Sequence, residues 1–137
     1  MPSGTPLVAT LTAEVPAQGT ANAAQSRMIG EAPTDAKVVG VSIIPNAALT
    51  AHATDYRTFS VVNKGADGSG STSIATFATD TVTTDDLVAF DEKALTLSAT
   101  AANLDVAEGD IIAAVETVAG SGVAHSGYQI KVDLRRR

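Results

Sequence analysis

The chain has no cysteine and no tryptophan, and its 137 residues include only three phenylalanines, two tyrosines and two histidines. Without cysteine there is neither a disulfide framework nor thiol chemistry. Because aromatic rings are scarce, the core has to be built from valine, isoleucine and leucine, which pack well on pleated strands. A hydrophobic content of 45% is typical of a globular chain, so we expect one folded domain.

No segment approaches the ~20 consecutive apolar residues that span a bilayer. The N-terminal sequence MPSGTPLVATL has neither a basic segment nor a long apolar run, so we expect no signal peptide. These patterns predict a soluble protein that is made in a cytoplasm and does not enter a membrane.

Negative charge dominates the second half of the chain. The formal net charge is −6, and between Asp80 and Glu116 nine acidic residues accompany the single base Lys93, which gives a local net charge of −8. A field of that sign repels phosphate backbones, so we expect no direct binding of nucleic acid by the folded body. We interpret the terminal run Arg135–Arg137 as a solvated tail.

All five prolines lie within the first 45 residues. Each proline fixes φ and removes a backbone donor, which favours extended and edge structure. We therefore predict an N-terminal arm over residues 1–36, with edge strands at 7–15 and 26–32, and a β-sandwich body over residues 37–137. We expect the arm to contribute more to association than to the fold.

From residue 37 onward, short β-branched runs alternate with turn sequences. The clearest run is the last one, where apolar residues from Tyr128 to Leu134 alternate with polar ones. Roughly eight strands with turns about every ten residues are typical of a β-sandwich or jelly roll. The predicted strands of the body are 37–44, 56–63, 71–79, 87–90, 93–98, 110–118 and 128–134, with a loop or one helical turn over 99–106. The predicted core contains Phe59, Leu95, Leu97, Ile112, Ile130, Val132 and Leu134.

Few residues are suited to catalysis. His52 and His125 both lie in loop-like sequence, and we interpret each as a solvated side chain. The adjacency of His125 and Ser126 does not make a dyad, because a dyad is a spatial arrangement. The segments 68–70 and 120–122 both read Gly-Ser-Gly and lack the G-x-S-x-G spacing of a nucleophile elbow. The sequence therefore predicts a protein that is not an enzyme.

The sequence also predicts no metal and no cofactor. Asp80, Asp85 and Asp86 offer oxygen ligands suited to calcium, but the periodic spacing of a calcium loop is missing. The carboxylate pairs 85–86 and 91–92 would point to opposite faces if they lie in strands. The glycine-rich segment 65–70 has no following Lys-Ser or Lys-Thr, so it does not predict a phosphate-binding loop.

A sugar-binding face usually presents aromatic platforms. Phe59, Phe77 and Phe90 all lie within the predicted strands, where core packing explains them better. Tyr56 and Tyr128 remain as candidates for such a platform.

Four segments of the chain carry a family resemblance. They read VVGVSIIPNAALT, TDYRTFSVVNKGADGSG, FDEKALTLSATAANLDVAEGDIIA and GYQIKVDL. In order and spacing, the region from Val38 to Leu134 resembles small head-decoration proteins of tailed bacteriophages, notably those that infect actinobacteria.

The resemblance implies a β-sandwich that docks on the outer surface of an assembled capsid, often as a trimer at a local three-fold axis. The partner would be the major capsid protein, and the location the outer surface of the virion. The N-terminal segment and two basic side chains are the predicted capsid or subunit contacts: Leu7, Val8, Leu11, Pro16, Arg27 and Arg57.

Three alternatives stay open on the sequence alone. An adhesin-like or carbohydrate-binding β-sandwich is the main one, although few aromatic residues are available for it. An enzyme on a jelly roll would need a metal cluster, which two distant histidines do not supply. A β domain with another role is the third.

Overall fold

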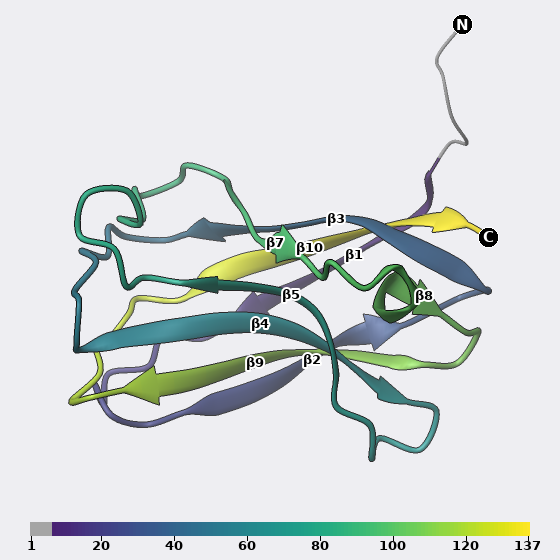
Figure 1. The fold of residues 1–137 in the computed structure, drawn as a ribbon, viewed down its shortest axis with the longest axis horizontal. Helices are drawn as coiled ribbons and strands as arrows, with labels where there is room; N and C mark the ends of the chain where they lie inside the picture. Colours follow the sequence, from purple (N-terminus) through teal and green to yellow (C-terminus); the bar gives the residue numbers. More distant parts are fainter. Residues whose placement is uncertain (1–6) are drawn as a thin grey trace, which may run out of the picture.

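The structure, a computed structural model, describes residues 7–137 and, within β1, side chains from Val8 onward. Two antiparallel sheets form a sandwich (Figure 1). The first, here the β10 sheet, has the order β1 (Leu7–Val15), β10 (Tyr128–Arg136), β3 (Ala36–Pro45) and β6 (Lys93–Ala94), with β8 (Asp105–Val106) also pairing with β3. The second, here the β9 sheet, has the order β2 (Gln25–Glu31), β9 (Ile111–Ala119), β4 (Tyr56–Gly65), β5 (Thr72–Ala78) and β7 (Thr96–Leu97). The predicted all-β sandwich is confirmed.

The core lies between the two sheets and follows the alternation read from the sequence. Every second residue of β10 from Tyr128 to Leu134 is buried, because successive side chains of a strand point to opposite faces. All of the predicted core residues pack there. Six are buried and Leu97 is partly buried against them: Phe59, Leu95, Ile112, Ile130, Val132 and Leu134.

One predicted strand, 93–98, is divided between the two sheets. Its first part, β6, pairs with β3, and its second part, β7, pairs with β5. Between them Leu95 is buried, and its backbone N–H donates to the carbonyl of Val41. The segment therefore crosses from one sheet to the other and closes one side of the sandwich. The short 3-10 helix η1 (Ala101–Leu104) follows it, where a loop or a single turn is predicted.

The predicted strand at 87–90 is wrong. The segment forms a single β-bridge, between Leu87 and Leu49, and no continuous strand, and Leu87 is buried. Phe90, which the same pattern assigns to the core, is 77% exposed. The physical reason is that one buried side chain anchors this segment, while the residues after it turn outward.

The N-terminal third is more closely integrated than an arm. The two predicted edge strands are present, as β1 and β2, and each is the outermost strand of its sheet. Val15, Ile29 and Ala32 are buried in the core. Residues 7–36 thus belong to the sandwich by strand pairing and burial, and the division at residue 36 does not appear in the fold. Residues 1–6 lie outside the described part of the chain.

The two ends of the sandwich differ. Figure 1 shows the C-terminus and the start of β1 at one end. The connections between β1 and β2, β3 and β4, β5 and β6, and β9 and β10 lie at the other end, which we call the loop end. Within residues 7–137, no helix has the length and apolar character needed to cross a membrane.

Candidate functional site

The four connections of the loop end are residues 16–24, 46–55, 79–92 and 120–127. Backbone hydrogen bonds join each of them to a neighbour, so they form one platform and not four separate loops. The bonds link Gln18 with His125 in both directions, Asn46 with Gly127, Leu49 with Leu87 in both directions, and His52 with Thr79.

A fully buried arginine holds two of these connections together. Arg57, on β4, is 0% exposed. Its guanidinium donates to the carbonyl oxygens of Ala23 (2.7 Å), Ala21 (3.1 Å) and Val123 (2.9 and 3.0 Å). These carbonyls lie in the 16–24 and 120–127 connections. A buried cation needs such partners, because desolvating it without compensation is costly.

Glu116, on the neighbouring strand β9, balances this charge. One carboxylate oxygen accepts from Arg57 Nη1 at 3.1 Å and lies 2.9 Å from Nε2 of His125. The other accepts from the amide of Gln25 at 3.0 Å and from the hydroxyl of Tyr128 at 2.8 Å. Burial alone would raise the pKa of Glu116, but the hydrogen bond and charge of His125, the hydrogen bond of Tyr128 and the charge of Arg57 together hold it below its usual value.

The two aromatic partners of Glu116 are fixed as well. Nδ1 of His125 accepts from the backbone N–H of Gly127 at 3.0 Å, so in the neutral ring Nε2 carries the proton and donates to Glu116. Burial and the adjacent carboxylate raise the pKa of Tyr128. Phe59 packs edge-on against both rings, with centroids 5.8 Å from His125 and 5.2 Å from Tyr128. We call Arg57, Glu116, His125, Tyr128 and Gln25 the buried cluster.

The buried cluster corrects three interpretations made from the sequence. His125 is not solvated, since its side chain is only 5% exposed, whereas His52 is exposed. Tyr128 is 3% exposed and cannot serve as a sugar platform. Arg57 cannot touch a capsid or another subunit while the protein stays folded. These groups give the loop end rigidity and are not displayed on its surface.

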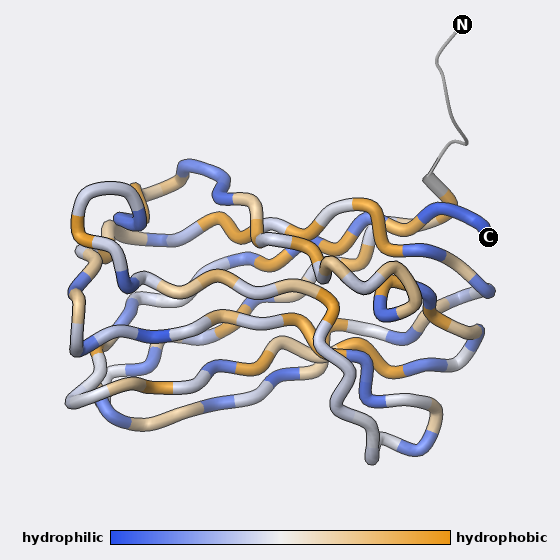
Figure 2. The backbone as a smooth tube through the Cα atoms, in the orientation of Figure 1, coloured by the Kyte–Doolittle hydropathy of each residue, from blue (hydrophilic) through white to orange (hydrophobic). Residues whose placement is uncertain are grey.

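The β5–β6 connection, residues 79–92, displays most of the large exposed hydrophobic side chains. Val82 is 54% exposed, Val88 57% and Phe90 77%. Phe90 also has a positive φ of 62°, a left-handed conformation that is unfavourable for a non-glycine residue. Figure 2 shows strongly hydrophobic and strongly hydrophilic stretches alternating in this connection.

Several contacts pin this connection in place. Leu87 is buried at its bridge to Leu49, and the backbone N–H of Phe90 donates to the carbonyl of Pro45 at 2.8 Å. The carboxylate of Asp86 accepts from the N–H of Ala51 at 2.7 Å. The carboxylate of Asp85 accepts from the N–H of Thr81 at 3.0 Å and closes a local turn. The exposed apolar side chains are thus presented by an ordered segment.

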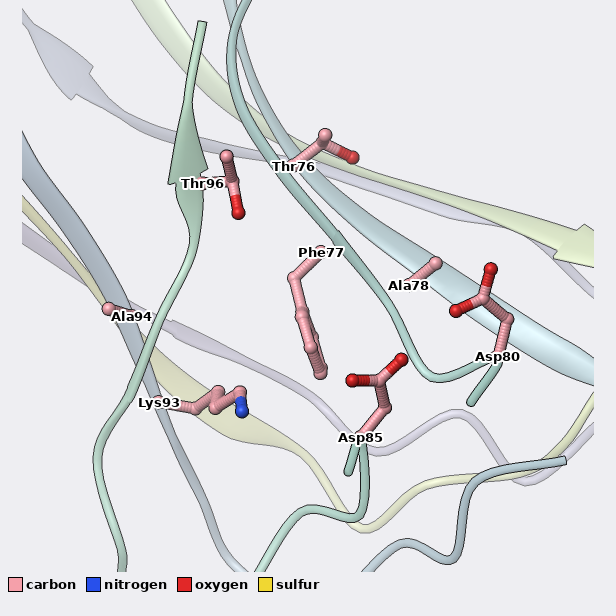
Figure 3. A pocket seen from close by; sticks show the side chains of 8 residues that line it. All are labelled: Thr76, Phe77, Ala78, Asp80, Asp85, Lys93, Ala94 and Thr96. Carbon is pink, nitrogen blue, oxygen red and sulfur yellow. The ribbon is translucent and has the colours of Figure 1, made fainter. Parts of the chain in front are cut away.

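A groove runs beside this connection, between β5 and the segment that crosses the two sheets. It has a volume of about 570 Å³ and is lined by Thr76, Phe77, Ala78, Asp80, Asp85, Lys93, Ala94 and Thr96. Figure 3 shows the Phe77 ring pointing into the space between Lys93 and Asp85. The ammonium of Lys93 lies 4.9 Å from the centre of that ring, a cation–π contact.

The outer face of the β9 sheet is unusual for a protein surface because it carries so little charge. The strand registers place one charged side chain on it, Glu31, which lies opposite Ile111 at one end of the sheet, and 15 further side chains, none of which is Asp, Glu, Lys or Arg. About a quarter or more of an ordinary surface is charged. We call this set the neutral face: Ser26, Met28, Tyr56, Thr58, Ser60, Val62, Ser73, Thr76, Ala78, Thr96, Ile111, Ala113, Val115, Thr117 and Ala119.

The outer face of the β10 sheet has the opposite character. Its strand registers place charged side chains on β1, β3 and β10: Glu14, Lys37, Lys131, Asp133 and Arg135. Lys131 pairs with Glu92 at 3.1 Å, and Thr10 donates to Asp133 at 2.9 Å. This face is suited to contact with water. The difference in charge between the two outer faces therefore comes from where the fold places the side chains and not from the average composition.

The structure does not gather the sequence-predicted contact residues into one site. Val8 and Leu11 pack partly buried against the core, so the fold itself uses them. Pro16 and Arg27 are exposed at different places, after β1 and on β2. Leu7 starts β1, and its side chain is outside the description. Of the six predicted contacts, only Pro16 and Arg27 are visibly free to meet a partner.

Among residues 7–137, no three His, Asp or Glu side chains come close enough to hold a metal ion. Searches against protein-family models, curated proteins and solved structures find no match for this chain.

Proposed function

We propose that the protein is a structural virion protein that decorates and stabilises the outer surface of a phage capsid by binding the major capsid protein. The sequence resemblance from Val38 to Leu134 suggests this role, and the β-sandwich is the fold that the resemblance implies. The observation that carries the proposal is the neutral face. It is a broad sheet surface with little charge on an otherwise acidic protein, as expected for a chain that works in an assembly.

The neutral face supports a homo-oligomer, with a trimer favoured by the resemblance. Subunits with a net charge of −6 repel one another. They meet most easily where each carries the least charge, and the buried centres of subunit interfaces are depleted of charged residues. Half-buried Val62 and Val115 and the exposed Met28 supply apolar surface on this face. Self-association would also cover β2, the free edge strand beside it.

One added charge tests the subunit contact. Ser60 lies on the neutral face, where its hydroxyl is 3.1 Å from that of Thr76. Ser60→Glu would bring like charges together in every copy of the interface, so we expect the oligomer to dissociate to monomers. Thr12→Glu, on the charged outer face of the β10 sheet, is the matched control and should leave the oligomer intact. Sedimentation velocity at low and high protein concentration measures both; an unchanged oligomer for Ser60→Glu would exclude this face.

Binding to capsids tests the function itself. The purified chain, mixed with capsids assembled from the major capsid protein of the virus that encodes it, should sediment with them and saturate at a fixed number of copies. Cryo-electron microscopy should then show density on the outer surface. A chain that stays monomeric at high concentration and also does not bind capsids would contradict the proposal.

The groove favours a second candidate function, carbohydrate binding by an adhesin-like module. The groove places an aromatic ring beside carboxylates and threonine hydroxyls, which are groups that proteins use to bind sugars. Against it, the ammonium of Lys93 already lies over the Phe77 ring. A glycan array separates the two candidates: specific, saturable binding that Phe77→Ala abolishes would favour the module, provided that the variant keeps its fold.

A further inference from the structure

We propose that the β5–β6 connection is the surface that docks on the capsid, and that its partner is a protein surface with an apolar pocket rimmed by lysine or arginine. This inference rests on the proposed function and names the site and the partner chemistry. The neutral face would hold the subunits together, whereas residues 79–92 would hold the assembly on its support.

The exposed apolar side chains of this connection are pre-organised. Residues that dominate a protein interface are usually large side chains held in place before binding, since ordering them on contact costs affinity. Val88 and Phe90 follow Leu87, which is buried and bonded to Leu49. Contacts from Pro45 and Ala51 hold the segment on either side of Leu87. The exposed ring of Phe90 is therefore carried by a segment that is already held in place before a partner binds.

Phe90 is destabilising where it stands. Its φ of 62° is strained for any residue with a Cβ, and a ring that is 77% exposed contributes little to the core. Glycine would satisfy the same backbone at lower cost. Residues in strained backbone conformations concentrate at binding sites. The fold itself does not require the strain at Phe90.

The β5–β6 connection is rich in negative charge. Between residues 80 and 92 there are five acidic residues and no base. Glu92 pairs with Lys131 of β10, and the carboxylates of Asp85 and Asp86 accept hydrogen bonds from backbone N–H groups. Asp91, next to Phe90, is exposed. An apolar tip with an acidic rim fits a pocket with a basic rim. It does not fit the same connection of a second copy, because acid would meet acid.

Two pairs of variants test the inference in the full chain. Phe90→Gly removes the ring and relieves the strained φ, so we expect an unchanged or higher Tm, an unchanged oligomer and capsid binding weakened more than about tenfold. Asp91→Lys and Glu108→Lys make the same charge change at the two ends of the sandwich. Only Asp91→Lys should weaken capsid binding, and the difference should shrink in high salt.

Each outcome has a definite meaning. If the wild-type chain binds capsids and Phe90→Gly binds them equally well, this inference is overturned and the proposed function is kept. If the wild-type chain does not bind capsids, both are overturned. If Phe90→Gly dissociates the oligomer, or abolishes glycan binding instead of capsid binding, the connection serves a second copy or a sugar and the inference is likewise overturned.

Discussion

Replacing Arg57 by methionine is expected to lower the free energy of unfolding by about 3–5 kcal/mol, because it leaves the charge of Glu116 buried without its cation. The damage extends beyond the ion pair. The carbonyls of Ala21, Ala23 and Val123 lose the donors that hold the 16–24 and 120–127 connections together. Each buried acceptor left without a partner adds to the cost. The measurement is equilibrium unfolding in urea.

The matched control is a surface ion pair of the same kind. Lys37 and Asp105 are 3.3 Å apart, with side chains 41% and 37% exposed. Lys37→Met should cost no more than about 1 kcal/mol, since exposed pairs contribute little. Equal losses for Arg57→Met and Lys37→Met would show that the buried cluster does not hold the loop end together.

The same cluster predicts a pH dependence. The pKa of Glu116 is lowered in the folded protein, so the folded state favours the ionised form. Stability from this group is therefore fully present above the ordinary glutamate pKa of about 4.5 and is lost as the pH falls through the lower folded-state value. Glu116→Gln should be less stable near neutral pH and should lose less stability on acidification. Melting temperatures between pH 3 and pH 7 measure this, and parallel curves for the two proteins would contradict it.

Periodicity was sufficient to predict the sheet framework. The boundaries of β1, β4, β9 and β10 lie within a few residues of the predicted ones. More and less buried residues alternate along β1, β10 and the first part of β4, which is the pattern that the sequence shows. Periodicity could not predict which strands pair with one another. The split of 93–98 between two sheets depends on which neighbours Leu95 finds in three dimensions, and no local pattern reports that.

The buried cluster was missed although a signal for it exists. In YRTFSVV, Arg57 has the same parity as the core residues Phe59 and Val61, and in IIAAVE, Glu116 has the same parity as Ile112. Opposite charges at core-facing positions of two strands predict a buried pair, provided that the strands are neighbours. His125 carries no such signal, because it lies in a connection between strands and contacts Glu116, Phe59 and Tyr128 only in three dimensions.

Phe90 was misplaced for a related reason. Hydrophobicity indicates burial only on average, and the sequence LVAF resembles a short strand. A single buried residue, Leu87, anchors the segment. Phe90 is 77% exposed and has a left-handed φ, and a local hydrophobic pattern reports neither property.

Substitutions at two neighbouring isoleucines should distinguish residues that stabilise the fold from residues that join subunits. The loss of folding stability at Ile112 is the second large effect that we expect. Ile112 is 0% exposed in the core, whereas Ile111, the residue before it, is half-buried and lies on the neutral face. Ile112→Ala should cost about 2–5 kcal/mol, because it removes buried methyl groups and leaves a cavity among residues that cannot close around it. Urea unfolding of the two variants measures the difference.

Ile111→Ala makes the same chemical change one residue away, on the other side of the strand. Since the wild-type side chain is already partly in water, we expect the monomer to lose much less stability, no more than about 1 kcal/mol. If the neutral face joins subunits, this variant should instead weaken self-association, seen as a larger fraction of monomer at a given concentration in sedimentation velocity. Equal losses of folding stability for the two variants would place Ile111 in the core, and an unaltered monomer fraction for Ile111→Ala would remove that end of the neutral face from the subunit contact.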